Sequence, residues 1–190
     1  AAVYDITFKF FGTDAIEKTV TSKVAHDSAV AEPDYPTTYR DESNEYTFTK
    51  WLDQDGNAFD PIGHKDAVYT AQYTASPLYT ATFMNEGEIF GEVSKYTKGE
   101  SVKAPAGTPT KAADKTASEY TFAGWFDEDG NALGTMGDKN AVYYAKYDPK
   151  YIDYTVTFIY KAADGTDVKE EKKYHFGAEI TIPEDPAGYK

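Results

Sequence analysis

The chain has 190 residues, a formal net charge of −13 at pH 7, and a hydrophobic fraction of 41% that is rich in Tyr and Phe. Phosphate binding needs clustered Lys and Arg, so this acidic chain is not expected to bind nucleic acid. It has no Cys, which excludes disulfides, thiolate metal ligands and a Cys nucleophile. It also lacks an apolar run near 18 residues, so we expect no membrane insertion within this segment.

The first predicted strand covers residues 4–10, where apolar and polar residues alternate. A period of two predicts a strand with one buried face and one face in water. The phrase Tyr-x-x-Thr-Phe begins at Tyr4, Tyr79 and Tyr154, so that both offsets are 75 residues (79 − 4 and 154 − 79). Three starts at one period indicate a tandem array of repeats.

A turn and a weaker strand follow in each copy, around residues 19–24, 92–96 and 168–174. The third copy is rich in Lys and Glu over residues 169–173, which favours a helix by local propensity. The repeat register nevertheless predicts an exposed strand there.

A polar stretch then leads to the central strand of each repeat. Residues 111–115 are compatible with about two helical turns that begin at Thr110 as N-cap. Residues 38–41 offer a similar helical start in the first copy. We therefore expect a mainly β fold, α+β at most.

The phrase Tyr-Thr-Phe-x-x-Trp is predicted to be the central strand. It ends at Trp51 and again at Trp125, 74 residues later (125 − 51). Trp lies on the opposite parity from the Tyr and Phe that precede it. A β-bulge near Lys50 or Gly124 would return Trp to the buried face, so we expect both tryptophans in the core.

An Asp-x-Asp-Gly-Asn segment follows each tryptophan, with Asp53 and Asp55 in the first copy and Asp127 and Asp129 in the second. These segments resemble half of a calcium loop, but the twelfth loop position is not Glu in either copy. The pattern favours a hairpin turn whose Asp side chains bind the backbone. Calcium binding by these four Asp residues is the weaker alternative.

The closing strand is predicted at residues 67–73 and 141–147. Its tyrosines recur in both copies: Tyr69, Tyr73, Tyr143 and Tyr147. An exposed row of these tyrosines is a candidate contact surface for a host protein or glycan. One parity of the strand must still face the core, so burial of the row is the alternative.

The repeats divide the chain into a first module (1–77), a second (78–149) and an incomplete third (150–190). The links at 74–77 and 148–150 are short, and each contains Pro. Such links are not flexible tethers, so we expect neighbouring modules to touch and to form an elongated rod.

The third module stops before its own Tyr-Thr-Phe-x-x-Trp strand. A lone hairpin is marginal in water. We expect residues 152–183 either to pack on the second module or to pair their open edge with another chain. We also expect the sequence to be a piece of a longer protein.

Four segments of the second module resemble a known family. They are Tyr-Thr-x-Thr-Phe from Tyr79, Val-x-x-Pro-x-x-x-Pro-Thr-Lys from Val102, Tyr-Thr-Phe-Ala-Gly-Trp from Tyr120, and Ala-Val-Tyr-x-Ala-x-Tyr from Ala141. Together they resemble the internalin-type B-repeat, also called the Listeria–Bacteroides repeat. The resemblance implies compact β-grasp-like (ubiquitin-like) modules that occur in tandem in bacterial cell-surface and secreted proteins. It implies no enzymatic activity and no cofactor.

The leading functional hypothesis is a non-catalytic extracellular spacer that supports an adhesion region of a bacterial surface or secreted protein. The alternative is a binding module that uses exposed aromatic strand residues. Motifs for nucleophilic hydrolysis, phosphate binding and dinucleotide binding are not present in the sequence. His26, His64 and His175 do not recur between repeats and do not have zinc-ligand spacing, so the sequence predicts no zinc site.

Overall fold

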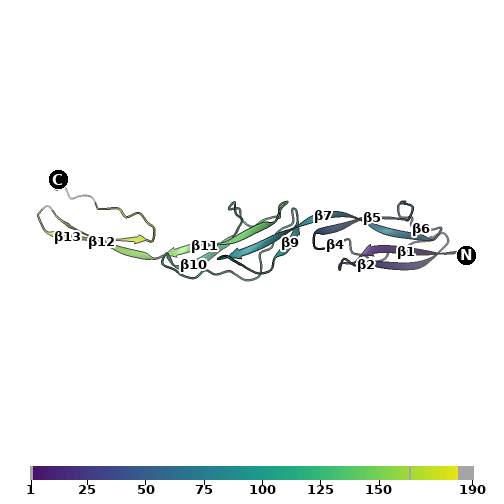
Figure 1. Ribbon diagram of the computed structural model, residues 1–190, viewed down its shortest axis with the longest axis horizontal. Helices are drawn as coiled ribbons and strands as arrows, with labels where there is room; N and C mark the ends of the chain where they lie inside the picture. The colour runs from purple at the N-terminus through teal and green to yellow at the C-terminus, as the bar shows by residue number, and fades with distance from the viewer. Residues whose placement is uncertain (1, 163, 184–190) are drawn as a thin grey trace. The chain divides into compact units, whose positions relative to one another are not determined.

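In the computed structural model, residues 2–162 and 164–183 are described, and they form strands joined by turns and loops without a helix (Figure 1). This confirms the predicted mainly β fold. In this described part of the chain, no helix is long and apolar enough to cross a membrane.

The chain divides into two compact units. Unit 1 comprises Ala1–Ala81, Val93–Lys103 and Gly134–Ala141. Unit 2 comprises Thr82–Glu92, Ala104–Leu133 and Val142–Lys190. The three-module division drawn from the repeats stays a prediction, and residues 163 and 184–190 of its third module lie outside the described residues.

The main sheet of unit 1 begins with the antiparallel hairpin of β1 (Val3–Phe11) and β2 (Glu17–Ala25). The first part of β7 (Ala67–Asn85) pairs in parallel with β1. β5 (Asn44–Leu52) is antiparallel to β7, and β4 (Thr38–Arg40) pairs with β5. The strands of unit 1 thus lie in the order β2-β1-β7-β5, with a parallel central pair. The likeness to a β-grasp fold stays a prediction.

Phe8 lies at the centre of the unit 1 core, as the alternation in β1 predicts. Its ring is 4.9 Å from the Trp51 ring in a T-shaped arrangement and 5.5 Å from the Tyr69 ring in a stacked one, centroid to centroid. Such aromatic pairs contribute about 0.5–1.5 kcal/mol beyond the area that they bury. The core therefore joins β1, β5 and β7 through three aromatic side chains.

Unit 2 repeats this arrangement with Phe83, Trp125 and Tyr143. The Phe83 ring is 5.0 Å from Trp125 and 5.4 Å from Tyr143, centroid to centroid. Trp125 belongs to β10 (Ala117–Phe126), and Tyr143 belongs to β11 (Ala141–Tyr151), which is antiparallel to β10. The same three residue types thus build both cores.

The predicted β-bulge is confirmed in both copies. The register of β5 shifts between Phe48 and Lys50, and that of β10 shifts at the equivalent place. Trp51 is 3% exposed and Trp125 is 6% exposed. The extra residue at each bulge turns the tryptophan to the buried face.

Four short strands complete the fold: β3 (Ser28–Ala29), β6 (Ile62–Gly63), β8 (Glu88–Ile89) and β9 (Ser94–Thr97). β3 pairs with β6, and both β8 and β9 pair with β7.

The two helical starts expected from sequence are wrong. Residues 38–40 form β4, and residues 111–114 have no regular secondary structure. Helices of about two turns are marginal in water. In the first copy the backbone gains inter-strand hydrogen bonds with β5 instead.

The third copy forms the two-stranded sheet of β12 (Asp153–Lys161) and β13 (Asp167–His175). The repeat register therefore predicted β13 correctly against its helical propensity. Within unit 2, Ile152 N donates to Thr116 O at 3.2 Å, and the Tyr154 hydroxyl donates to Lys115 O at 2.9 Å. Pairing of this hairpin with another chain stays a prediction.

Candidate functional site

Strand β7 carries the chain from the first repeat into the second without a loop. The predicted link, residues 74–77, lies inside this 19-residue strand. Each of these four residues is paired with a residue of β5, within 44–47. A segment paired in this way does not swivel as a free tether does.

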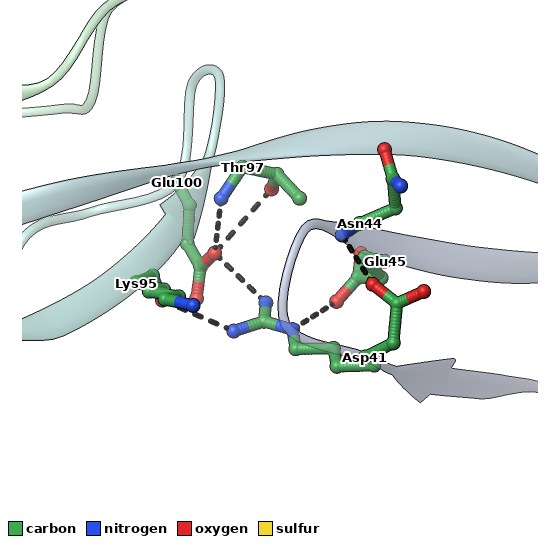
Figure 2. Close-up of polar contacts among 7 residues, drawn as sticks. Asp41, Asn44, Glu45, Lys95, Thr97 and Glu100 are labelled. Carbon is green, nitrogen blue, oxygen red and sulfur yellow. Dashed lines mark hydrogen bonds and ion pairs between the residues drawn. The ribbon is translucent and has the colours of Figure 1, made fainter. Parts of the chain in front are cut away.

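A polar cluster, which we call the Arg40 junction, lies beside this paired link in unit 1 (Figure 2). Its members are Arg40, Asp41, Asn44, Glu45, Lys95, Thr97 and Glu100. Arg40 and Glu45 belong to the first repeat, and Glu100 belongs to the second. The cluster therefore contains charged partners from two successive repeats.

The Arg40 guanidinium binds three acceptors. Its Nε is 2.7 Å from Glu45 Oε2, its Nη2 is 2.9 Å from Glu100 Oε2, and its Nη1 donates to Lys95 O at 3.2 Å. The planar guanidinium holds its donors in a fixed fork, so it can fix the relative positions of several acceptors. A Lys ammonium at this position would not reproduce that geometry.

Glu100 is also positioned by hydrogen bonds from a residue of its own repeat. Its Oε2 accepts hydrogen bonds from Thr97 N at 2.9 Å and from Thr97 Oγ1 at 3.3 Å. The Lys95 ammonium also donates to the carbonyl of Glu42. Each of the two repeats thus contributes a side chain that bonds to a residue of the other repeat.

Asp41 fixes the turn between β4 and β5. Its Oδ1 accepts from Ser43 N and Asn44 N, both at 2.7 Å, and its Oδ2 accepts from the Tyr46 hydroxyl at 3.1 Å. The two backbone bonds lower the pKa of Asp41. The ordered turn presents Ser43 O to Leu78 N, at 2.8 Å. The turn is therefore bonded to the first residue after the link.

Hydrogen bonding and burial have opposite effects on the pKa values of Arg40 and Glu100. Partial burial disfavours the charge of Arg40, but the hydrogen bonds to Glu45 and Glu100 outweigh it and raise the pKa of Arg40. Partial burial likewise acts to raise the pKa of Glu100, but the Thr97 N–H and the Arg40 guanidinium outweigh it and lower that pKa. Both groups are therefore held in their charged forms at neutral pH.

The sequence-based prediction did not include the Arg40 junction, because it is not part of the repeat pattern. One signal was present. Arg40 is the only Arg in a chain that has 18 Lys residues. A position where Arg is used in such a chain points to a need for the forked geometry.

The four tyrosines proposed as a contact surface do not form an exposed row. Tyr69 and Tyr143 are each 5% exposed, because their parity of the closing strand faces the core. Tyr73 and Tyr147 are partly buried. The Tyr73 hydroxyl accepts from a backbone N–H at 3.0 Å, and the Tyr147 hydroxyl donates to Asn85 Oδ1 at 2.6 Å. Contact with a host protein or glycan stays a prediction, without these residues as its surface.

The candidate calcium residues lie in the predicted turns. Asp53 Oδ1 accepts from the backbone N–H groups of Asp55 and Asn57, at 2.9 and 2.8 Å. The backbone and side-chain N–H groups of Asn57 lower the pKa of Asp53. Asp127 accepts the same pair of hydrogen bonds from the equivalent Asn. Asp55 and Asp129 are exposed, and calcium binding at these loops stays a prediction.

A surface pocket of about 360 Å³ in unit 1 is lined in part by Asp53, Asp60 and Tyr69. Asp60 Oδ1 accepts from Ile62 N at 2.9 Å, and Asp53 accepts the turn hydrogen bonds just described. Both carboxylates therefore have a local structural role. The pocket gives no support to an acid–base pair.

The repeated sheet and the strand β7, which runs from the first repeat into the second, are features of tandem β-repeat modules. Residues 79–146 match the family model of the Listeria-Bacteroides repeat domain. This match agrees with the family resemblance found in the sequence of the second repeat. The comparison with curated proteins finds no match.

Among solved structures, the chain is similar to "Streptococcal High Identity Repeats in Tandem (SHIRT) domains 3-4 from cell surface protein". The identity is 14%, and the alignment covers 77% of this chain and 99% of that chain, with a TM-score of 0.28.

Proposed function

We propose that this chain is a non-catalytic structural segment that spaces or presents an adhesion region of a bacterial surface or secreted protein. The observation that carries the proposal is the course of β7 through the link, where residues 74–77 are all paired with β5. A spacer must transmit position from one repeat to the next. A paired strand does so, whereas a loop of the same length does not.

Two kinds of restraint support this role. The ladder between β5 and the link resists bending out of the sheet. The fork of Arg40, with Glu45 on one side and Glu100 on the other, resists rotation about the strand. Because these restraints act in different directions, together they restrict the joint more than either one alone.

The mechanical part of the proposal can be tested with spin labels. The chain has no Cys, so Ser22→Cys and Thr121→Cys would supply the only two thiols, at exposed positions of β2 and β10. We expect a narrow distribution of distances between the two labels. Insertion of Gly-Ser-Gly-Ser between Ala75 and Ser76 should broaden it. An unmodified chain with a distribution as broad as that of the insertion variant would contradict the proposal.

The extracellular location is supported by the family match over residues 79–146. It predicts that antibodies raised against this chain label intact cells of the source bacterium. It also predicts that protease added to those cells removes the signal. Labelling that appears only after lysis would place the protein inside the cell and would contradict this part of the proposal.

A further inference from the structure

Two histidines that are far apart in the sequence lie side by side in unit 1. His26 follows β2, and His64 follows β6. The pairing of β3 with β6 brings their segments together, and Asp27 N donates to Gly63 O at 3.0 Å. The two imidazole centroids are 5.9 Å apart.

Asp27 lies between the two imidazoles. Its Oδ2 is 3.3 Å from His26 Nε2, and its Oδ1 is 3.1 Å from His64 Nδ1. Asp27 adopts a φ of 58°, a left-handed conformation in which Asp is enriched among non-Gly residues. This conformation belongs to the turn between β2 and β3. The turn therefore places the carboxylate and the preceding imidazole at the same edge of the fold.

We propose that His26, Asp27 and His64 form a binding site for a divalent transition-metal ion such as Zn²⁺. One ligand atom from each residue lies within 4.8 Å of the others. Tetrahedral ligands at about 2.1 Å from zinc lie about 3.4 Å from one another. Each imidazole nitrogen is already near that distance from one Asp27 oxygen, 3.3 Å from Oδ2 for His26 and 3.1 Å from Oδ1 for His64. Small rotations of the exposed side chains would bring one ligand atom from each of the three residues to that spacing.

The kinds of ligand select the class of metal. Imidazole nitrogen suits Zn²⁺, Ni²⁺ and Cu²⁺, whereas Ca²⁺ and Mg²⁺ prefer shells made of oxygen ligands. Two imidazoles and one carboxylate leave at least one coordination position of zinc for water. The site is thus chemically distinct from the Asp-rich turns that resemble calcium loops.

Tyr4 supplies an outer contact of the kind that metal-binding histidines use. Its hydroxyl is 3.3 Å from His26 Nδ1, the ring nitrogen that faces away from Asp27. A histidine that binds metal through one nitrogen donates its other N–H to a nearby acceptor. With Nε2 on the metal, Nδ1–H would donate to the Tyr4 hydroxyl and hold the ring in position.

The direct test is calorimetric titration of the tag-free chain with ZnCl₂ in a buffer that does not chelate metal. We expect saturable binding of one Zn²⁺ per chain. His26→Ala and His64→Ala should each weaken it at least tenfold. Asp27→Asn should do the same, since Asn tolerates the positive φ but lacks the charge. His175→Ala is the matched control and should leave the affinity unchanged.

A second readout does not depend on calorimetry. Zn²⁺ at about 100 times its Kd should raise the unfolding temperature by on the order of 5 °C, and EDTA should reverse the rise. Ca²⁺ at the same concentration should leave it unchanged. Tyr4→Phe should weaken Zn²⁺ binding less than either His variant does, because it removes an outer contact and no ligand.

The side chains of His26 and His64 are 49% and 52% exposed, so we expect their Ala variants to fold, which circular dichroism will verify. A chain that shows no saturable Zn²⁺ binding would overturn the proposal. Binding that is unchanged in the two His variants would also overturn it. The cluster would then be a hydrogen-bonded surface group without a metal function. Either result leaves the proposed spacer role untouched.

Discussion

The junction after the first repeat and the junction after the second share one backbone scheme. At the first, Leu78 N donates to Ser43 O at 2.8 Å; at the second, Ile152 N donates to Thr116 O at 3.2 Å. In both, the acceptor belongs to a turn whose Asp side chain accepts two backbone N–H groups. In both, the predicted link lies within a strand, β7 or β11.

The side chains at the two junctions differ. The residue before the turn Asp is Arg40 in the first repeat and Ala113 in the second. The residue that follows the positive-φ Gly after β9 is Glu100, and the residue at the equivalent place after β13 is Ala178. Both partners of the ion pair at the first junction are therefore Ala at the second.

This difference teaches which features the repeat itself determines. The hydrogen bonds of the backbone need only the turn and the strand, so every copy of the repeat can form them. The ion pairs need particular side chains in two successive copies. We infer that the repeat sets the path of the chain through each junction, and that individual residues then adjust how strongly a given junction is held.

The largest expected effect comes from removing the tryptophan in the core of each repeat. Trp51→Ala and Trp125→Ala should each lower the free energy of unfolding of the affected repeat by about 3–5 kcal/mol, because each leaves a cavity beside a buried Phe. Each variant retains one Trp, whose fluorescence reports on the other repeat during urea unfolding. If β7 couples the repeats, the midpoint reported by the remaining Trp should also fall. An unchanged midpoint would show that the repeats unfold independently.

Most of the fold could be predicted because the copies of the repeat can be compared with one another. Trp51 and Trp125 both lie on the parity opposite to the Tyr and Phe before them, and this shared position predicted the bulge. A single copy would have been weaker evidence for it. The same register overrode the helical propensity of residues 169–173. Where the copies differ in length, around residues 111–115, local propensity was the only guide and it was wrong.

The candidate sites could not be predicted from the repeat. Arg40 meets Glu100, and His26 meets His64, across distances in sequence that no local pattern encodes. The expected exposure of Tyr69 and its equivalents was not found, for a different reason. Alternation shows that one parity of the closing strand is buried, but it does not say which parity until the partner strands are known.

Arg40→Ala would give the first junction the residue that precedes the turn Asp at the second, which is Ala113. It removes two ion pairs and the bond to Lys95 O, and it leaves Glu45 and Glu100 without their counter-charge. Exposed pairs contribute about 0–1 kcal/mol each, so we expect a loss of about 1–2 kcal/mol from the free energy of unfolding, reduced in high salt. Urea unfolding followed by tryptophan fluorescence would measure it.

The matched control is Lys98→Ala, which removes the highly exposed ion pair with Asp138, 3.2 Å in length. It should change the stability by less than about 0.5 kcal/mol. Arg40→Lys should recover only part of the loss, since it restores the charge without the fork. Equal effects of Arg40→Ala and Lys98→Ala would show that the Arg40 junction is no more than a surface ion pair.

The pH dependence of stability should also separate the two junctions. The pKa of Glu100 is lowered from its ordinary value, so the unfolded state binds more protons and stability rises with pH. The contribution is complete above about pH 5 and is lost as the pH falls through the folded-state pKa. The pKa of Asp41 at the first junction and that of Asp114 at the second are lowered in the same direction and by the same kind of backbone hydrogen bond.

The variant Glu100→Gln isolates this contribution. It should be less stable than the parent chain at pH 7 by about 1 kcal/mol or less, since Glu100 is partly exposed. The two stabilities should converge toward pH 3, where Glu100 is protonated. Urea midpoints measured at several pH values would show this. Parallel curves from pH 7 to pH 3 would mean that Glu100 does not titrate with unfolding.

The smallest effect, and the sharpest test of equivalence, comes from building the first junction's ion pair at the second. Ala113→Arg with Ala178→Glu should protect the amides of β13 from hydrogen exchange, corresponding to about 0.2–1 kcal/mol, whereas either change alone should have almost no effect. The relevant quantity is the coupling energy, which is the effect of the double variant minus the effects of the two single variants. This difference removes the separate effects of each change on propensity and charge. A coupling near zero would mean that the shared turns and backbone bonds do not place these positions as they place Arg40 and Glu100.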